Sequence, residues 1–518
     1  MEVSQTKSNG KTAVQKCNAS LRRRNQRLRS KVADQKQLLA IADEDLRDAK
    51  SRIRQMELKI EFLTQQIHRA DDTSTSVKRP FTDPNVFGHR FAASMIALCV
   101  NLANTMPIRT VSKALQIVMD ALGISTDIPD RETITRWIKR LGVSKLKQNQ
   151  TLDRWKGDQD MIWIVDHSNQ IGTQKALVIL GIPASRLPSQ GETLSLDALE
   201  VLLIEPGDSW ARDDMRRVYR QLADVIGCPR FVLCDGAVEL RETVDVLCED
   251  DHEVIVLRDF KHFAANRFES LIGRSARFQA FAAEMGKTRC RIQQTELAHL
   301  NPPAVKTKSR FMNIAPVISW AQMVLGILDD PEAKEAGVGD VKKLRDRLGW
   351  LNDYRDDIAS WRRCCEAIDR SLAWINTHAL NLNSGQDLQT HLALLRQERC
   401  ELSDRLSARL VMHVQSCALM LAEGERSWLS SEALESIFGL FKRREGQQSR
   451  SGFTGLIATL PTLLCTWTPA EVRTALQATS TKEAQQWINE KVGTTLWAKR
   501  ARAFKYFGKR KSHDLATL

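Results

Sequence analysis

The feature that most constrains the fold of this chain is a pair of short apolar segments that each end in an aspartate. Residues 161–165 are apolar and precede Asp166, and the strand-like residues 229–234 precede Asp235 and a glycine. Apolar runs of this length are typical of buried β-strands rather than helices. The pattern therefore predicts two buried strands, each of which carries a carboxylate at its end.

Other segments complete an alternating series of strands and helices. Strands are predicted at residues 175–182, 198–204 and 252–257, and helices at residues 208–223 and 238–247 and after the last strand. The predicted order, strand-strand-strand-helix-strand-helix-strand-helix, is that of the ribonuclease H-like fold. In this order Asp166 and Asp235 face one cleft. We assign residues 158–273 to the first part of this α/β core and residues 426–475 to its second part.

A third carboxylate is expected on a helix at residues 430–442. In-line attack at a phosphodiester builds negative charge on two oxygens, which two Mg²⁺ ions about 3.5–4 Å apart stabilise. Such hard cations need oxygen ligands. Glu435 is favoured because Lys442 lies seven residues further on, two turns along the same face. Glu432, one turn earlier, is the alternative ligand or a solvated residue.

These motifs resemble those of bacterial-type DDE transposases, over residues 160 to about 460. The contexts of the two aspartates and the glutamate match, as does the basic residue seven positions after the glutamate. Asp259 and His262 resemble the Asp/Cys-x-x-His motif of hAT and Mutator-like transposases. Two departures concern the subfamily: Trp428 and Ser431 replace a Tyr and an Arg of some insertion-sequence families, and no zinc-finger module is visible.

The resemblance implies a DNA transposase that cleaves transposon ends and transfers the strands to target DNA. Asp166, Asp235 and Glu435 would be its catalytic and metal-binding residues, with two Mg²⁺ ions for which Mn²⁺ can substitute. Asp259 and His262 would form an accessory motif. Its partner would be double-stranded DNA, and the protein would be cytoplasmic and associated with the nucleoid.

The 200 residues between Asp235 and Glu435 exceed what the bare fold requires, so an insertion is expected. Residues 274–425 have a helical pattern throughout and are predicted to form an all-α domain. Four tryptophans fall within it: Trp320, Trp350, Trp361 and Trp374. Packing in the core is the simpler interpretation of these side chains, and stacking on a flipped base is the alternative.

The N-terminal residues 1–75 have a heptad pattern. Apolar residues recur every seven positions at Val32, Leu39, Leu46, Ile53, Ile60 and Ile67, with Asn25 in the same register. This pattern predicts a parallel coiled-coil dimer, and the protein is therefore expected to be a homodimer or a larger homo-oligomer. A long amphipathic helix packed on its own protein is the alternative.

Residues 80–150 are predicted to form three short helices. The last begins after Pro129 and Asp130, and its polar face carries Arg131, Arg136, Lys139 and Arg140. A helix-turn-helix would place this helix in the major groove. A purely structural helical bundle is the alternative.

Composition agrees with a nucleic-acid enzyme. The net charge is +13, and basic residues cluster near the N-terminus, at Arg443 and Arg444, and in a basic tail at residues 476–518. Such clusters bind phosphates without reading sequence. The 11 cysteines lack Cys-x-x-Cys spacing, which argues against zinc and against a disulfide framework. No membrane span is expected, because residues 316–328 are too short.

Two other functions share parts of this pattern. A related nuclease with the same core would hydrolyse nucleic acid without joining strands, and it would use the same carboxylates. A catalytically inert, domesticated DNA-binding coiled-coil protein would retain the flanking regions, but the intact Asp166, Asp235 and Glu435 argue against it.

Overall fold

The structure is a computed structural model, and the chain divides into residues 1–82 and residues 83–518. It describes residues 81, 83–86, 88–151, 155, 160–169, 175–207, 210–248, 253–304, 310–330, 341–393, 400–445, 454–493 and 498–505. The predicted coiled coil at residues 1–75 lies outside the described residues. All the elements below belong to the second unit.

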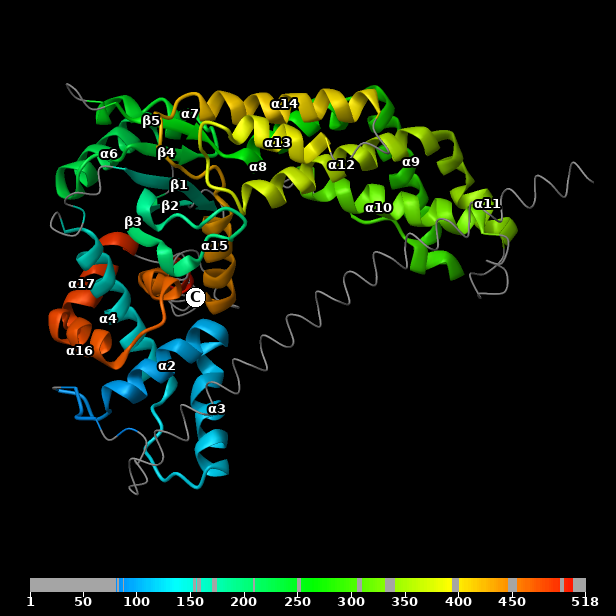
Figure 1. Ribbon diagram of the computed structural model, residues 1–518. Coiled ribbons are helices and arrows are strands. Elements are labelled where there is room, and N and C mark those ends of the chain that lie inside the picture. The colour runs from blue at the N-terminus through cyan, green and yellow to red at the C-terminus, as the bar shows by residue number, and fades with distance from the viewer. Residues whose placement is uncertain are drawn as a thin grey trace, which may run out of the picture. The chain divides into compact units, whose positions relative to one another are not determined.

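A five-stranded mixed sheet forms the centre of the fold (Figure 1). Its strands are β1 (Met161–Asn169), β2 (Lys175–Pro183), β3 (Glu200–Gly207), β4 (Phe231–Cys234) and β5 (Ile255–Arg258). They are arranged in the order β3-β2-β1-β4-β5. Strand β2 is antiparallel to β1 and β3, whereas β4 is parallel to β1 and β5 is parallel to β4. The five predicted strands and their order along the chain are confirmed.

Helix α6 (Arg212–Ile226) connects β3 to β4 and packs on one face of the sheet. Its Met215, Tyr219 and Leu222 lie in one apolar cluster with Trp163 of β1 and Val232 of β4. Between β4 and β5 lie α7 (Val238–Arg241) and a 3₁₀ turn, Val244–Leu247. Residues 161–165 of β1 are all buried. A strand covered on both faces has a continuous apolar run rather than an alternating one, which explains the pattern before Asp166.

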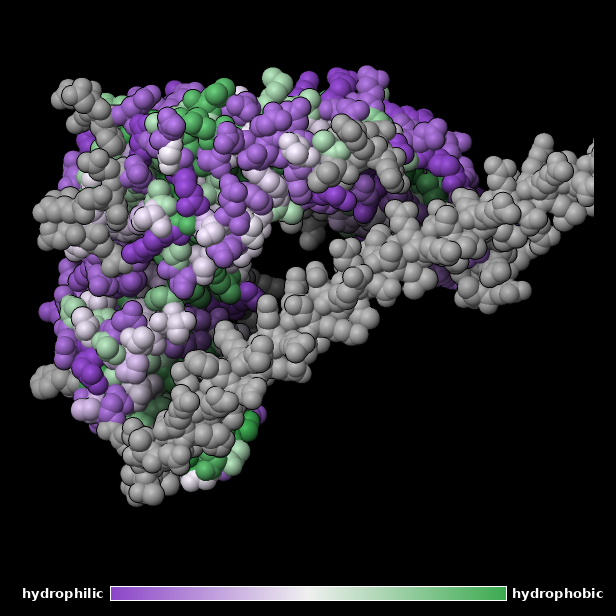
Figure 2. Space-filling view, viewed as in Figure 1, coloured by the Kyte–Doolittle hydropathy of each residue, from purple (hydrophilic) through white to green (hydrophobic). Residues whose placement is uncertain are grey.

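The other part of the core is built by the helices that come before and after the sheet. Helices α2 (Ala93–Thr105), α3 (Ile108–Ala121) and α4 (Arg131–Asn149) confirm the three helices predicted in residues 80–150. Asp130 caps α4 by accepting a hydrogen bond from Thr133 N at 2.6 Å. Helix α3 leaves Ile117, Val118 and Leu122 exposed, and they contribute to the hydrophobic surface at the lower end of α3 in Figure 2.

The C-terminal helices pack against α4. They are a 3₁₀ helix at Gly455–Leu464, α16 (Pro469–Ala478) and α17 (Thr481–Val492). Ala484 and Ile488 of α17 lie in an apolar cluster with Val143 of α4. The end of α4 also covers the edge strand, because Asn149 Nδ2 donates to Val201 O at 3.0 Å. Residues 476–518, expected as a basic tail, thus begin with a packed helix.

The insertion between the second and third acids is helical in the residues described. It contains α8 (Phe260–Phe268), α9 (Ala276–Ile292), α10 (Arg310–Asp329), α11 (Val341–Leu348), α12 (Arg355–Ile375), α13 (Ser384–Ala393) and α14 (Glu401–Ala418). Figure 1 shows α9 to α14 lying together on one side of the sheet. The all-α domain predicted at residues 274–425 is therefore confirmed as helical in the residues described.

The tryptophans of the insertion lie in or near its core. Trp320 and Trp361 are buried. Trp361 packs edge-on against Phe278 with ring centroids 5.1 Å apart, and Trp374 stacks on His378 at 4.5 Å. The packing interpretation is therefore confirmed for the buried members. Among the described helices, including the apolar α10, none has the length and hydropathy needed to cross a membrane.

Candidate active site

Asp166 and Asp235 lie at corresponding positions on two adjacent parallel strands. The last residue pair of the β1–β4 ladder joins Val165 to Cys234, and each aspartate is the next residue along the chain. Asp166 accepts a hydrogen bond from His167 N at 2.7 Å, and Asp235 accepts one from Ala237 N at 2.7 Å. The backbone therefore holds the two acids side by side at the same end of the sheet.

A glycine directs the chain away from this pair. Gly236 has a φ of +88°, which residues with a side chain rarely adopt. A Cβ atom at this position would lie 2.7 Å from Arg258 Nε. The glycine therefore allows both the sharp turn after Asp235 and the close approach of the Arg258 side chain.

The two carboxylates of this pair lie close enough to affect each other's ionisation. Burial raises the pKa of Asp166 to about 7, and the adjacent Asp235 carboxylate adds to the shift. Within the described part of the chain, neither aspartate forms an ion pair. Two adjacent carboxylates of this kind suit a hard divalent cation, which takes oxygen ligands.

Asp259 is a buried link between the sheet and two helices. It follows β5, and its own N–H donates to Cys234 O at 2.8 Å. Its Oδ1 accepts from His262 N at 2.7 Å and so caps α8, while its Oδ2 accepts from Ser431 N at 2.6 Å. Ser431 immediately precedes α15 (Glu432–Glu445). One carboxylate thus stabilises the N-termini of both α8 and α15, where negative charge is favoured.

His262 is held as a cation beside the acids. Its Nδ1 lies 3.0 Å from Asp259 Oδ1. This hydrogen bond raises the pKa of His262 to about 9, and the charges of Asp166 and Asp235 act in the same direction. Although burial opposes ionisation of Asp259, its hydrogen bonds with His262 hold its pKa below the usual value. The predicted Asp259–His262 motif therefore forms one charged pair at the end of the sheet.

Glu435 is held in place by side chains from other segments, whereas Asp166 and Asp235 are placed by the backbone of the sheet. It lies in the first turn of α15, a helix that contacts β1. Lys261 Nζ of α8 lies 2.6 Å from Glu435 Oε2 and 3.3 Å from Glu432 Oε1. Glu432 also accepts a hydrogen bond from Asn376 Nδ2 at 2.5 Å. The two glutamates thus share one lysine as an ion-pair partner.

The structure brings the first two acids together but does not close a three-ligand site. No group of three or more His, Cys, Asp or Glu side chains among the described residues is placed to hold a metal ion. Asp166 and Asp235 provide two oxygen ligands. The side chain of Glu435 is 39% exposed, so it has room to turn.

Two of the predicted DNA-binding residues are buried, which corrects the sequence interpretation. Arg140 donates to the backbone oxygens of Thr479 and Leu476 at 2.9 and 2.7 Å. Arg444 donates to Thr459 O at 3.1 Å and is 9% exposed. Both guanidinium groups join distant segments of the chain, so they are not available to DNA.

The other predicted basic residues are more accessible. Arg131, Arg136, Lys442 and Arg443 are exposed, and Lys139 is partly buried. Burial lowers the pKa of Lys139. The surface available for phosphate contacts is therefore the start of α4 and the end of α15.

Sequence reasoning missed Lys261, Ser431 and Asn376. Lys261 lies between Asp259 and His262 of the Asp-x-x-His motif. Its position inside the motif was the signal that could have suggested an ion pair with one of the acids. Ser431 contributes through its backbone N–H, which carries no sequence signal. Asn376, at the end of α12, is 56 residues from Glu432 in the chain, so only the fold shows their contact.

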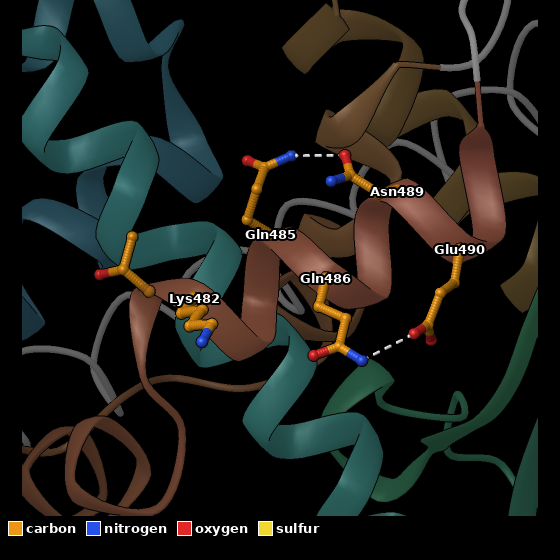
Figure 3. Close-up of a pocket in the computed structure, with 6 residues that line it drawn as sticks. Lys482, Gln485, Gln486, Asn489 and Glu490 are labelled. Atoms are coloured by element: carbon orange, nitrogen blue, oxygen red, sulfur yellow. Dashed lines mark hydrogen bonds between the residues drawn. The ribbon is translucent and has the colours of Figure 1, made fainter.

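A separate hollow lies beside α17 (Figure 3). It is lined by Thr481, Lys482, Gln485, Gln486, Asn489 and Glu490, all exposed. Gln485 donates to Asn489 and Gln486 to Glu490 along the helix, both at 2.9 Å. These are ordinary contacts of a solvated helix face. None of the acids described above lines this hollow.

Among solved structures, the chain is similar to that of a Drosophila P element transposase strand transfer complex. The identity is 10% over 79% of this chain and 100% of that chain, and the TM-score is 0.41. No family model and no curated protein matches the chain. The function is therefore inferred from the geometry of the site and the sequence motifs.

Proposed function

We propose that this protein is a DNA transposase that cleaves transposon ends and joins them to target DNA. The observation that carries the proposal is the placement of Asp166, within β1, beside Asp235, which directly follows the adjacent parallel strand β4; neither forms an ion pair with another described residue. The strand order β3-β2-β1-β4-β5, with β2 antiparallel, supports a ribonuclease H-like core. The DDE-type motifs of the sequence support the same assignment.

Asp166, Asp235 and Glu435 would hold the metal ions. The two aspartates fit this role, because they are adjacent carboxylates and neither forms an ion pair with another described residue. Two Mg²⁺ ions, when bound, would stabilise the negative charge on the attacking and leaving oxygens. Glu435 would have to leave Lys261 to complete the ligand set.

The remaining groups of the site would orient the acids and the DNA. Asp259 holds the start of α15 and thereby the backbone position of Glu435. The His262 imidazolium faces the two aspartates and could donate a hydrogen bond to a phosphate oxygen there. Arg131, Arg136, Lys442 and Arg443 would contact the DNA backbone as point charges that do not read sequence.

Assembly and location remain part of the proposal. The heptads of residues 1–75 would join two copies of the chain, so that the dimer could engage two DNA ends. The net charge of +13 supports a double-stranded DNA partner and an association with the nucleoid in the cytoplasm.

A strand-transfer assay tests the proposal. Linear duplexes that carry the inverted repeats flanking the gene are incubated with the protein, Mg²⁺ and a supercoiled plasmid. We expect nicking at the repeat ends and covalent joining of labelled ends to the plasmid. Asp166→Asn should reduce both by about a thousandfold or more, because a metal ligand is lost.

The matched control is Asp224→Asn, which removes an exposed carboxylate from α6. This variant should cut and join like the wild type. Cleavage without joining would instead identify a nuclease, and cleavage that survives Asp166→Asn would refute the site.

A further inference from the structure

Lys261 forms an ion pair with Glu435, the third acid of the proposed site. It lies two residues after Asp259, in the first turn of α8, and its side chain is only 18% exposed. The distance of 2.6 Å between Lys261 Nζ and Glu435 Oε2 is that of a strong charge-assisted hydrogen bond. The same ammonium lies 3.3 Å from Glu432 Oε1.

The two glutamates differ in what else holds them. Glu432 Oε2 also accepts a hydrogen bond from Asn376 Nδ2, and Asn376 belongs to the end of α12 in the insertion. Among the residues the structure describes, the Glu435 side chain has Lys261 as its ion-pair partner. Glu432 is therefore anchored on two sides, whereas Glu435 can turn once the lysine releases it.

We propose that Lys261 is a latch that holds Glu435 away from the metal site until a divalent cation binds, and that Glu432 then keeps the released ammonium. This inference rests on the proposed function, because it concerns the third ligand of that site. Because Glu432 already lies within reach of Lys261, the ammonium keeps an anionic partner when Glu435 leaves. The exchange therefore leaves no unpaired charge behind.

If Lys261 is a latch, it must lower the affinity of the site for a divalent cation. A divalent cation that recruits Glu435 must break the hydrogen bond with Lys261, so the lysine competes with the metal ion. A lysine that merely positioned Glu435 for the metal would have the opposite sign, since its removal would weaken binding. Metal affinity in the absence of DNA distinguishes these two roles.

The test is a titration of the full-length protein with Mn²⁺ alone, followed by the electron paramagnetic resonance signal of free Mn²⁺. Lys261→Met should tighten binding about tenfold, the change expected for loss of one competing charge-assisted hydrogen bond. Lys343→Met is the matched control, because it breaks a lysine–glutamate pair of 2.7 Å on the exposed surface. It should leave the affinity unchanged.

A double-mutant cycle tests the part assigned to Glu432. Glu432→Gln should weaken Mn²⁺ binding in the wild-type background, because Lys261 then has only Glu435 as an anionic partner. In the Lys261→Met background the same substitution should have little effect. Equal weakening in both backgrounds would show that Glu432 is itself a ligand, and it would overturn the latch.

The remaining outcomes separate the latch from the proposed function. If Asp166→Asn removes the Mn²⁺ site but Lys261→Met leaves the affinity unchanged or weaker, the latch is wrong and the metal site stands. If the wild type has no Mn²⁺ site that depends on Asp166, both fail. Lys261→Gln and unfolding midpoints in EDTA verify that any change does not come from misfolding.

Discussion

The acids on the strands and the acid on the helix are positioned by different means. Asp166 and Asp235 follow the last residue pair of a backbone ladder, so their relative placement depends on main-chain hydrogen bonds. Glu435 reaches the same end of the sheet through Asp259, which holds the start of α15, and through Lys261. The strand pair is thus fixed by secondary structure, whereas the helix acid depends on a few side chains from distant segments.

Asp259→Ala should produce the largest loss of stability, because it breaks the connection of the helix acid to the sheet. Removal of this fully buried carboxylate leaves His262 and the Ser431 N–H without their partner. We expect the free energy of unfolding to fall by about 3–5 kcal/mol, because the backbone N–H groups of His262 and Ser431 and the partly exposed imidazolium each lose their acceptor, at about 1–3 kcal/mol for each buried group. Urea unfolding measures it, with Asp224→Ala as the exposed control; an equal loss in both would contradict the role of Asp259.

Burial of Asp166 should make the free energy of unfolding depend on pH when no metal ion is present. The pKa of Asp166 is raised to about 7 in the folded protein, so the folded state stays protonated while the unfolded state ionises. Stability from this group is therefore lost as pH rises from about 4 to about 7, by up to about 4 kcal/mol. Asp166→Asn should lack this loss, and the two unfolding curves in EDTA should diverge over that range. Parallel curves would show that Asp166 is not buried as a carboxyl.

Gly236→Ala tests whether the turn that follows Asp235 requires a glycine. The substitution forces a side chain into a positive-φ conformation and against Arg258. We expect a cost of about 1–3 kcal/mol. Gly286→Ala in α9 is the control, since a Cβ there meets nothing within 4 Å. It should be neutral or slightly stabilising, and a similar cost at both positions would remove the special role of the turn.

Lys442→Ala should have the smallest effect and concerns the far end of the helix that carries Glu435. The exposed ammonium is expected to contact one DNA phosphate, so the variant should reduce the salt dependence of binding by about one contact. Fluorescence anisotropy over a range of salt concentrations measures the slope. The exposed Lys287 of α9 provides the control variant Lys287→Ala. An unchanged slope in Lys442→Ala would exclude the residue from the interface.

The sequence predicted those parts of the fold that depend on local pattern. The five strands, the position of Asp235 directly after β4, the cap at Asp130 and the helical insertion all follow from short-range periodicity and capping chemistry. Asp166 was expected at the end of its strand, but β1 continues to Asn169, because residues 167–169 pair with β2. The site residues themselves stay predictions, because function has to be tested at each of them.

The features that sequence reasoning missed depend on contacts between distant segments. Arg140 is buried because α16 and the residue after it, more than 330 positions along the chain, supply its acceptors. A basic residue on a helix looks the same in sequence whether it faces water or such a partner. The pairing of Lys261 with Glu435, 174 residues apart, has the same origin.

The insertion returns to the point where it left the sheet. Phe260 N, at the start of α8, donates to Leu429 O at 3.0 Å, and Leu380 pairs with Ser427 in an isolated bridge. His413 of α14 lies 3.1 Å from Arg258 O and stacks on Phe263. The insertion is thus a closed loop, because hydrogen bonds hold its first and last residues together near Asp259.

Closing such a loop costs conformational entropy that grows only with the logarithm of its length. Doubling the number of residues between the fastened ends would add only about 0.6 kcal/mol. The fold therefore places almost no thermodynamic limit on the number of residues between Phe260 and Leu429. Domains of other lengths could replace the helices there without moving the third acid, provided that they keep the two ends together.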